Sequence, residues 1–104
     1  MNEISIPTVQ IQGVPDPLPD SVVVLDVRED NEWQSGHVDG ALHIPLASLP
    51  ARADELPADK QILAICHSGG RSAQATGYLV QRGIDAVNLD GGIVAWQRAG
   101  RAVV

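Results

Sequence analysis

The sequence predicts an α/β fold built around a mostly parallel sheet. Two short runs, 22–25 and 62–65, are continuously apolar, which is typical of strands buried on both faces. Segments with helical spacing and glycine stops follow them, so strands alternate with helices along the chain. With 104 residues, 44% of them hydrophobic, the chain is long enough for one domain and too short for two. We therefore expect a single α/β domain over residues 1–104.

A local pattern sets each predicted element. Loose alternation of apolar residues predicts an edge strand over 4–11, and three prolines predict a loop over 13–19. After the strand Val22–Asp26, we expect Asp30 to cap a short helix that ends at Gly36. The remaining elements are expected to be a strand at 41–44, a helix over 46–56 interrupted at Pro50, a turn at 57–60, a strand at 62–65, a helix over 72–82, a strand at 86–89 and a helix over 93–99.

The only cysteine, Cys66, lies between the apolar run 62–65 and a predicted helix. A thiol is a good nucleophile only as the thiolate, and a free cysteine has a pKa of roughly 8.5. A helix N-terminus offers unpaired N–H donors and a partial positive charge, which favour an anion. This position predicts that Cys66 is a nucleophile and that residues 66–71 form its anion-binding cradle.

The residues after Cys66 support that interpretation. Two glycines allow the backbone to turn its N–H groups inward, and an arginine adds a cation suited to an anion with two oxygens. The histidine titrates near neutral pH, and the serine hydroxyls are hydrogen-bond donors or helix caps. The alternative is an inert buried cysteine, which would not require such a loop. The residues expected to bind the substrate anion are His67, Ser68, Gly69, Gly70, Arg71 and Ser72.

Composition limits the partners and the compartment. The net charge is −6, from 13 acidic and 7 basic residues, which argues against nucleic acid and anionic membranes as partners. An anionic substrate then needs local positive potential, which Arg71, the loop N–H groups and His67 are expected to supply. One cysteine, no signal-peptide pattern and no long apolar run predict a cytoplasmic protein in a reducing compartment.

Other polar and aromatic residues have either a role at the site or a structural one. Asp26 and Arg28 follow the end of a strand, as Cys66 does, and carboxyl ends of neighbouring parallel strands share one edge. They are therefore supporting residues of the site, with Asp26 expected to accept loop N–H bonds and Arg28 to pair with an acidic residue at 29 or 32. We expect a turn role for His37, a strand position for His43 and packing for both tryptophans. Cysteine and histidine spacing fits no zinc pattern, so no metal or cofactor is expected. The side chains expected to be solvated surface charges are Arg52, Lys60, Arg82, Arg98 and Arg101.

Four sequence blocks together resemble the single-domain form of the rhodanese family. The blocks, in family order, are D-V-R-E at 26–29, G-H-x-x-G-A-x-x-I-P at 36–45, C-x-S-G-x-R-S at 66–72 and G-G-x-x-A-W at 91–96. The resemblance implies a doubly wound sheet of about five strands flanked by helices. It also implies a ping-pong sulfurtransferase in which Cys66 takes the sulfane sulfur of a donor, becomes a persulfide and passes the sulfur to a thiol or cyanide.

The loop discriminates among related activities. Four residues separate Cys66 from Arg71, as in sulfurtransferases, whereas related phosphatases and arsenate reductases carry five. The pair His67-Ser68 matches neither the basic residues of some thiosulfate-specific members nor the Gly-Ser of mercaptopyruvate-using members, so thiosulfate is the default donor. Two alternatives stay open: a persulfide carrier or interaction module that serves a protein partner and, less favoured, a phosphatase or arsenate reductase.

Overall fold

A computed structural model describes residues 5–104 and confirms the α/β architecture. Its five strands form one sheet in the order β1-β5-β4-β2-β3, with every neighbouring pair parallel. The strands are β1 (Thr8–Val9), β2 (Val22–Asp26), β3 (Leu42–His43), β4 (Gln61–Ile65) and β5 (Ala86–Leu89). The helices are α1 (Asp30–Gln34), α2 (Leu49–Arg52), α3 (Gly70–Gln81) and α4 (Gly92–Arg98), with 3-10 turns at Ile11–Gly13, Leu46–Ser48 and Ala53–Glu55.

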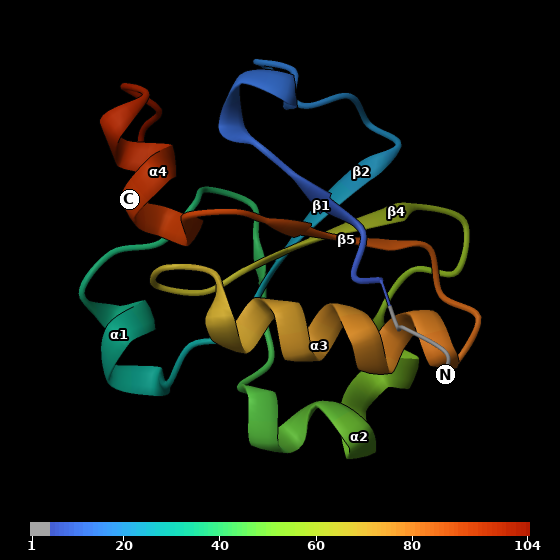
Figure 1. Cartoon of the computed structure of the whole chain (residues 1–104). Helices are drawn as coiled ribbons and strands as arrows, with labels where there is room; N and C mark the ends of the chain where they lie inside the picture. The colour runs from blue at the N-terminus through green and yellow to red at the C-terminus, as the bar shows by residue number, and fades with distance from the viewer. Residues whose placement is uncertain (1–4) are drawn as a thin grey trace.

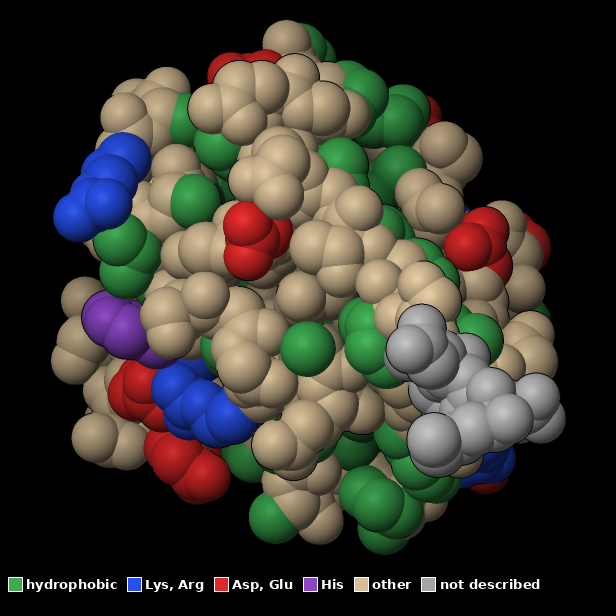
Figure 2. Space-filling model, viewed as in Figure 1, with side chains coloured by type: hydrophobic (Ala, Val, Ile, Leu, Met, Phe, Trp, Pro, Cys, Tyr) green, Lys and Arg blue, Asp and Glu red, His purple; other side chains and the backbone are tan. Residues whose placement is uncertain are grey.

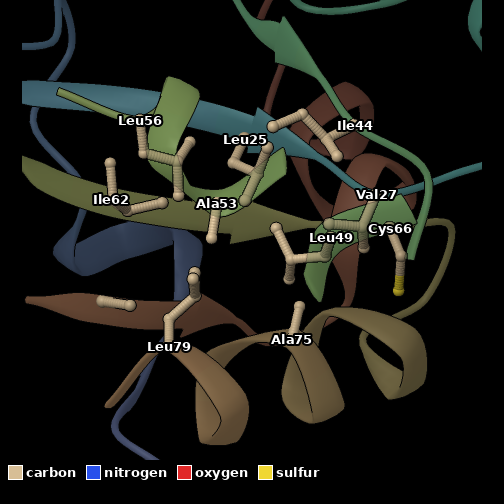
Figure 3. Packing of buried hydrophobic residues seen from close by; sticks show 11 residues of the cluster. Leu25, Val27, Ile44, Leu49, Ala53, Leu56, Ile62, Cys66, Ala75 and Leu79 are labelled. Atoms are coloured by element: carbon tan, nitrogen blue, oxygen red, sulfur yellow. The ribbon is translucent and has the colours of Figure 1, made fainter. Parts of the chain in front are cut away.

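The sheet separates two hydrophobic cores. Helices α2 and α3 cover one face, and α4 together with the segment between β1 and β2 covers the other (Figure 1). Successive side chains of a strand point to opposite faces, so in β4 Ile62 joins the core under α3 while Leu63 joins the core under α4. Cys66 falls on the α3 face, at the end of that core, with its sulfur directed toward the first turn of α3 (Figure 3).

Several sequence expectations differ from the structure in detail. The helix expected over 72–82 begins two residues earlier, as α3, and the strand expected at 41–44 is only β3. The strand expected over 4–11 is only Thr8–Val9, because the chain then turns and Val14 N–H donates to the Ile11 carbonyl; position 4 lies outside the described residues. Helix α1 is capped by Glu29, not Asp30, through a capping box in which Glu29 and Glu32 each accept the other's backbone N–H. The helix expected over 46–56 is a series of short turns, with Pro50 in the first turn of α2 as predicted.

The carboxyl ends of the strands gather the polar segments at one edge. Strands β2 and β4 are neighbours, with Asp26 opposite Ile65, so the segments that follow them lie next to each other. Helix α1 and the first turns of α3 and α4 lie at this same edge (Figure 1). Within residues 5–104, the helices are all too short or too polar to cross a bilayer.

Candidate active site

Cys66 is buried among hydrogen-bond donors. Its side chain is 2% exposed, and its sulfur accepts a hydrogen bond from Gly69 N–H at 3.0 Å. The Ser72 hydroxyl, from the first turn of α3, lies 3.3 Å from the same sulfur. Gly69 makes the turn possible because it holds φ +116°, in the region that favours glycine, directly before the helix begins.

These donors favour the thiolate. Burial raises the pKa of the Cys66 thiol, but hydrogen bonds from the Ser72 hydroxyl and from the N–H groups of Ser72, Gly69 and Ser68 outweigh it. The pKa of Cys66 therefore lies below its ordinary value, because these groups are better partners for a charged sulfur than for a neutral one. Such a thiol is a stronger nucleophile near neutral pH.

The start of α4 sets which way the loop peptides point. The N–H groups of Ile93 and Val94 donate to the carbonyl oxygens of Cys66 and His67, at 2.8 and 3.2 Å. In a planar trans peptide the C=O and N–H point in opposite directions, so the N–H groups of those two peptides, on His67 and Ser68, point away from the α4 start, and the Ser68 N–H is one of those that favour the Cys66 thiolate. The block at 91–96 thus has a role at the site that sequence reasoning missed.

Close approach of α4 depends on Gly92. A Cβ at this position would lie 2.4 Å from the Cys66 carbonyl oxygen and 2.6 Å from that of His67, and the residue has φ +56°. Neither the space nor the backbone conformation accepts a side chain. The signal in the sequence was the glycine pair that opens the last helix, but its contact with Cys66 exists only in the folded chain.

Arg71 does not lie free beside the cysteine. Its Nη1 and Nη2 donate to the two carboxylate oxygens of Glu32 in α1, at 2.6 and 2.8 Å. This bidentate pair holds the pKa of Glu32 at about 2. An acidic side chain of the protein therefore occupies the guanidinium in this structure, and the expected role of Arg71 in binding a substrate anion stays a prediction.

Asp26 and Arg28 form a second pair, deeper in the molecule. Asp26 is fully buried and accepts hydrogen bonds from Arg28 N–H, Nε and Nη2 at 2.8 to 3.0 Å. Arg28 Nη2 also donates to the Gly36 carbonyl at 2.8 Å. Arg28 thus pairs with Asp26, and not with residue 29 or 32 as expected, because its guanidinium folds back over the strand end. The pair ties the β2 end to the turn after α1.

Asn88 is a site residue that the sequence analysis missed. This amide lies in β5, is 4% exposed, and its Oδ1 is 2.6 Å from the Ser72 hydroxyl. The hydroxyl carries one proton, so it donates either to Asn88 or to the Cys66 sulfur at a given moment. The available signal was a single amide inside the otherwise apolar strand Ala86–Leu89.

The remaining predicted residues occupy the rim. The structure places residues 67–69 in the turn after β4 and residues 70–72 in the first turn of α3; His67, Ser68 and Gly70 are exposed, and Ser72 is buried. His37 donates to the Trp33 carbonyl from a turn, and His43 donates to that of Arg28 from β3.

One aromatic side chain, Trp33, and one basic side chain, Arg101, make more specific contacts than expected. The indole of Trp33 stacks on both imidazoles, with ring centroids 3.6 Å from His37 and 4.7 Å from His43. Arg101 is not a solvated charge: it lies over the Trp96 ring and donates to the carbonyls of Ile11, Val14 and Pro15. It therefore ties the C-terminal segment to the N-terminal loop.

Comparison with known proteins places this geometry in a family. A model of the rhodanese-like domain matches residues 14–99. This chain belongs to the rhodanese-like domain family. The match covers the loop residues around Cys66 and the α4 start that supports them.

Individual relatives agree with the family match. A sulfurtransferase from Allochromatium vinosum is 41% identical over 86 residues, covering 82% of this chain and 80% of that protein. Thiosulfate sulfurtransferase GlpE from Shewanella oneidensis is 35% identical over 80 residues, covering 76% and 79%. The crystal structure of a rhodanese-related protein from Thermoplasma volcanium superposes with a TM-score of 0.87 at 33% identity, covering 94% of this chain and 97% of the other.

Proposed function

We propose that this protein moves a sulfane sulfur from a small donor, such as thiosulfate, to a thiophilic acceptor through a persulfide on Cys66. The observation that carries the proposal is the Cys66 sulfur itself. It is the one cysteine of the chain, and its hydrogen bonds with Gly69 N–H and the Ser72 hydroxyl lower its pKa. Relatives named as sulfurtransferases support the same reaction class.

The first half-reaction is a displacement at sulfur. The Cys66 thiolate attacks the outer sulfur of thiosulfate, a new S–S bond forms, and the S–S bond of the donor breaks. The electron pair of that bond leaves with sulfite, so the products are sulfite and the Cys66 persulfide, and the charges balance at −3 on each side. No external oxidant or reductant takes part.

The second half-reaction regenerates the enzyme. A thiolate or cyanide attacks the terminal sulfur of the persulfide, and the electron pair of the broken bond returns to Cys66 as thiolate. The persulfide's terminal sulfur is anionic near neutral pH, and the N–H groups of the loop 67–72 stabilise charge there as an oxyanion hole does. Glycines at 69 and 70 leave those N–H groups unobstructed.

The loop size supports sulfur rather than phosphorus chemistry. Four residues stand between Cys66 and Arg71, which makes a narrow cradle suited to a persulfide. Arg71 is also engaged by Glu32, so it does not offer a free fork to a tetrahedral oxyanion. Transfer of sulfur therefore fits this site better than phosphate ester or arsenate chemistry.

Intact mass spectrometry tests the persulfide directly. The protein is treated with thiosulfate, measured, and then treated with cyanide, alongside the Cys66→Ser variant. We expect the wild type to gain the mass of one sulfur (about 32 Da, the atomic mass of the element) and to lose it to cyanide, while the variant gains none. Absence of any sulfur adduct on the wild type would overturn small-donor transfer. Loading by a persulfurated protein alone would indicate a carrier instead.

A further inference from the structure

The arginine of the cysteine loop has an acidic partner within the protein. Glu32 binds both Nη atoms of Arg71, and the two residues stand 39 positions apart in the chain, so the contact joins α1 to the first turn of α3. Basic and acidic side chains lie side by side near these two helices in Figure 2, with a histidine beside them. The positive charge closest to the loop is thus paired within the protein.

The start of α1 holds the Glu32 carboxylate in position to bind Arg71. Its Oε1 also accepts Glu29 N–H at 3.0 Å, as part of the capping box that begins the helix. Arg71 holds the pKa of Glu32 at about 2, so the carboxylate stays ionised at neutral pH and well into the acid range. Its side chain is 27% exposed and that of Arg71 is 34% exposed, so the pair stands at the mouth of the site rather than in the core.

The neighbouring cation is occupied as well. Arg28 is 5% exposed, and its guanidinium is held by the Asp26 carboxylate and the Gly36 carbonyl. Glu29 adds a further negative charge near Arg71, which contributes to raising the pKa of that guanidinium. The chain as a whole carries a net charge of −6. An approaching anion therefore meets backbone dipoles at the sulfur but little uncompensated positive charge around it.

We propose that Glu32 is a specificity-determining residue that makes the site prefer singly charged sulfane donors over the thiosulfate dianion. The inference rests on the proposed sulfur transfer at Cys66 and names the class of donor. The favoured class comprises organic thiosulfonates, in which a carbon group replaces a charged oxygen of thiosulfate, and persulfides of small thiols, in which an organic thiolate is the leaving group in place of sulfite. Each extra negative charge on the donor weakens its binding, because Glu32 already neutralises the charge of Arg71.

The surface next to the loop fits an organic group. A hollow of about 220 Å³ borders the loop at His67 and has Glu32, Gln97 and the Asp26-paired Arg28 on its polar side. Ile93 and Val103 form an apolar part of its wall. A donor with a small carbon group can place that group against these apolar side chains, whereas thiosulfate has only oxygens to offer there.

Two donors that differ by one charge test the proposal. Methanethiosulfonate carries a methyl group where thiosulfate carries an oxyanion, and both deliver the same sulfur, leaving methanesulfinate or sulfite. We expect the wild type to have a higher kcat/KM with methanethiosulfonate. In Glu32→Gln, we expect the ratio of the two kcat/KM values to shift toward thiosulfate by about five- to tenfold, chiefly through KM. Glutamine can still accept the Glu29 N–H bond, so the helix start is retained.

Asp85→Asn is the matched control. It removes the same unit charge from an exposed side chain just before β5, at the opposite end of the sheet from Cys66. We expect the donor ratio of this variant to stay within twofold of the wild type. An equal shift in both variants would mean that net charge alone sets the preference and would overturn the role of Glu32.

Ionic strength gives a test that needs no variant. If paired charges leave the mouth of the site without net positive potential, added salt screens repulsion and raises kcat/KM for thiosulfate more than for methanethiosulfonate. A fall in kcat/KM for thiosulfate with salt would reveal an attractive site and overturn the inference. Loading of Cys66 by both donors with an unchanged ratio in Glu32→Gln would overturn the inference alone. Loading by neither donor would overturn the proposed function with it.

Discussion

Two helix starts meet at Cys66, and they act on opposite sides of the same loop. Helices α3 and α4 both begin after a glycine with positive φ, Gly69 at +116° and Gly91 at +78°, and neither has a side-chain cap. The start of α3 faces the sulfur and gives it hydrogen-bond donors. The start of α4 faces the back of the loop and takes up the carbonyl groups of Cys66 and His67.

The difference shows how a short loop keeps several N–H groups directed at one atom. The loop can turn its N–H groups toward the sulfur because the carbonyl groups on its other side have hydrogen-bond partners in α4 and are not left unpaired. Gly69 and Gly91 also touch across the two starts, since a Cβ on Gly69 would lie 3.3 Å from the Gly91 nitrogen. The α4 start is thus support for the cradle, although it does not contact the sulfur.

The largest expected effect comes from separating the two starts with Gly92→Ala. The added Cβ would overlap the carbonyl oxygens of Cys66 and His67, and alanine would also be strained at φ +56°. We expect the free energy of unfolding to fall by about 3 kcal/mol or more and kcat/KM to fall at least ~100-fold. Denaturant unfolding and sulfur-transfer kinetics measure the two effects.

Gly100→Ala separates backbone strain from overlap. Gly100 has φ +81°, but a Cβ there would have no neighbour within 4 Å. We expect this variant to lose about 1 kcal/mol of stability and to keep wild-type kcat/KM. If Gly92→Ala behaved in the same way, the α4 start would not support the loop.

The front of the loop is tested by Ser72→Ala, with a smaller expected effect. Removing the hydroxyl takes away a donor that favours the thiolate, so we expect the pKa of Cys66 to rise. At neutral pH less thiolate is present, and the pH profile of Cys66 alkylation moves to higher pH. Thiolate absorbance titration provides an independent reading.

Thr76→Val is the control for a lost buried hydroxyl. Thr76 lies one turn further along α3, and its hydroxyl donates to the Ser72 carbonyl at 2.8 Å rather than to the sulfur. We expect lower stability in this variant but an unchanged Cys66 pKa. A similar pKa rise in both variants would point to general loosening of α3 and not to the Ser72 hydrogen bond.

Local patterns predicted more of this molecule than contacts through space. The strands at 22–26 and 62–65 followed from continuous apolar runs, and the cysteine at a strand–turn–helix junction followed from the two glycines and the arginine. The Glu32–Arg71 pair did not follow, because it requires knowing that α1 lies against α3. The support from Gly92 and the amide of Asn88 were missed for the same reason: their partners come from other strands and helices. That Cys66 is the nucleophile stays a prediction.

The ion pair between Glu32 and Arg71 holds the start of α3 but has no counterpart described at the start of α4. Its loss has the smallest expected effect. Glu32 has a folded-state pKa of about 2 against an ordinary 4.5, so the Arg71 pair stabilises the protein above pH 4.5 and loses this contribution as the pH falls toward 2. Both side chains are about one-third exposed, so solvent screening reduces the contribution to about 1 kcal/mol. We expect Glu32→Gln to be less stable than the wild type by this amount at pH 7, with the difference shrinking as the pH approaches 2.

Urea unfolding at several pH values measures that difference, and Glu55→Gln is its control. Glu55 binds Arg52 through two hydrogen bonds, as Glu32 binds Arg71, but both partners are exposed and belong to one short segment. Water screens such a pair, so we expect no measurable change in stability. If the two variants lost equal stability with the same pH dependence, the link between α1 and the first turn of α3 would be no stronger than a surface ion pair. The loop would then depend on α4 alone for its position.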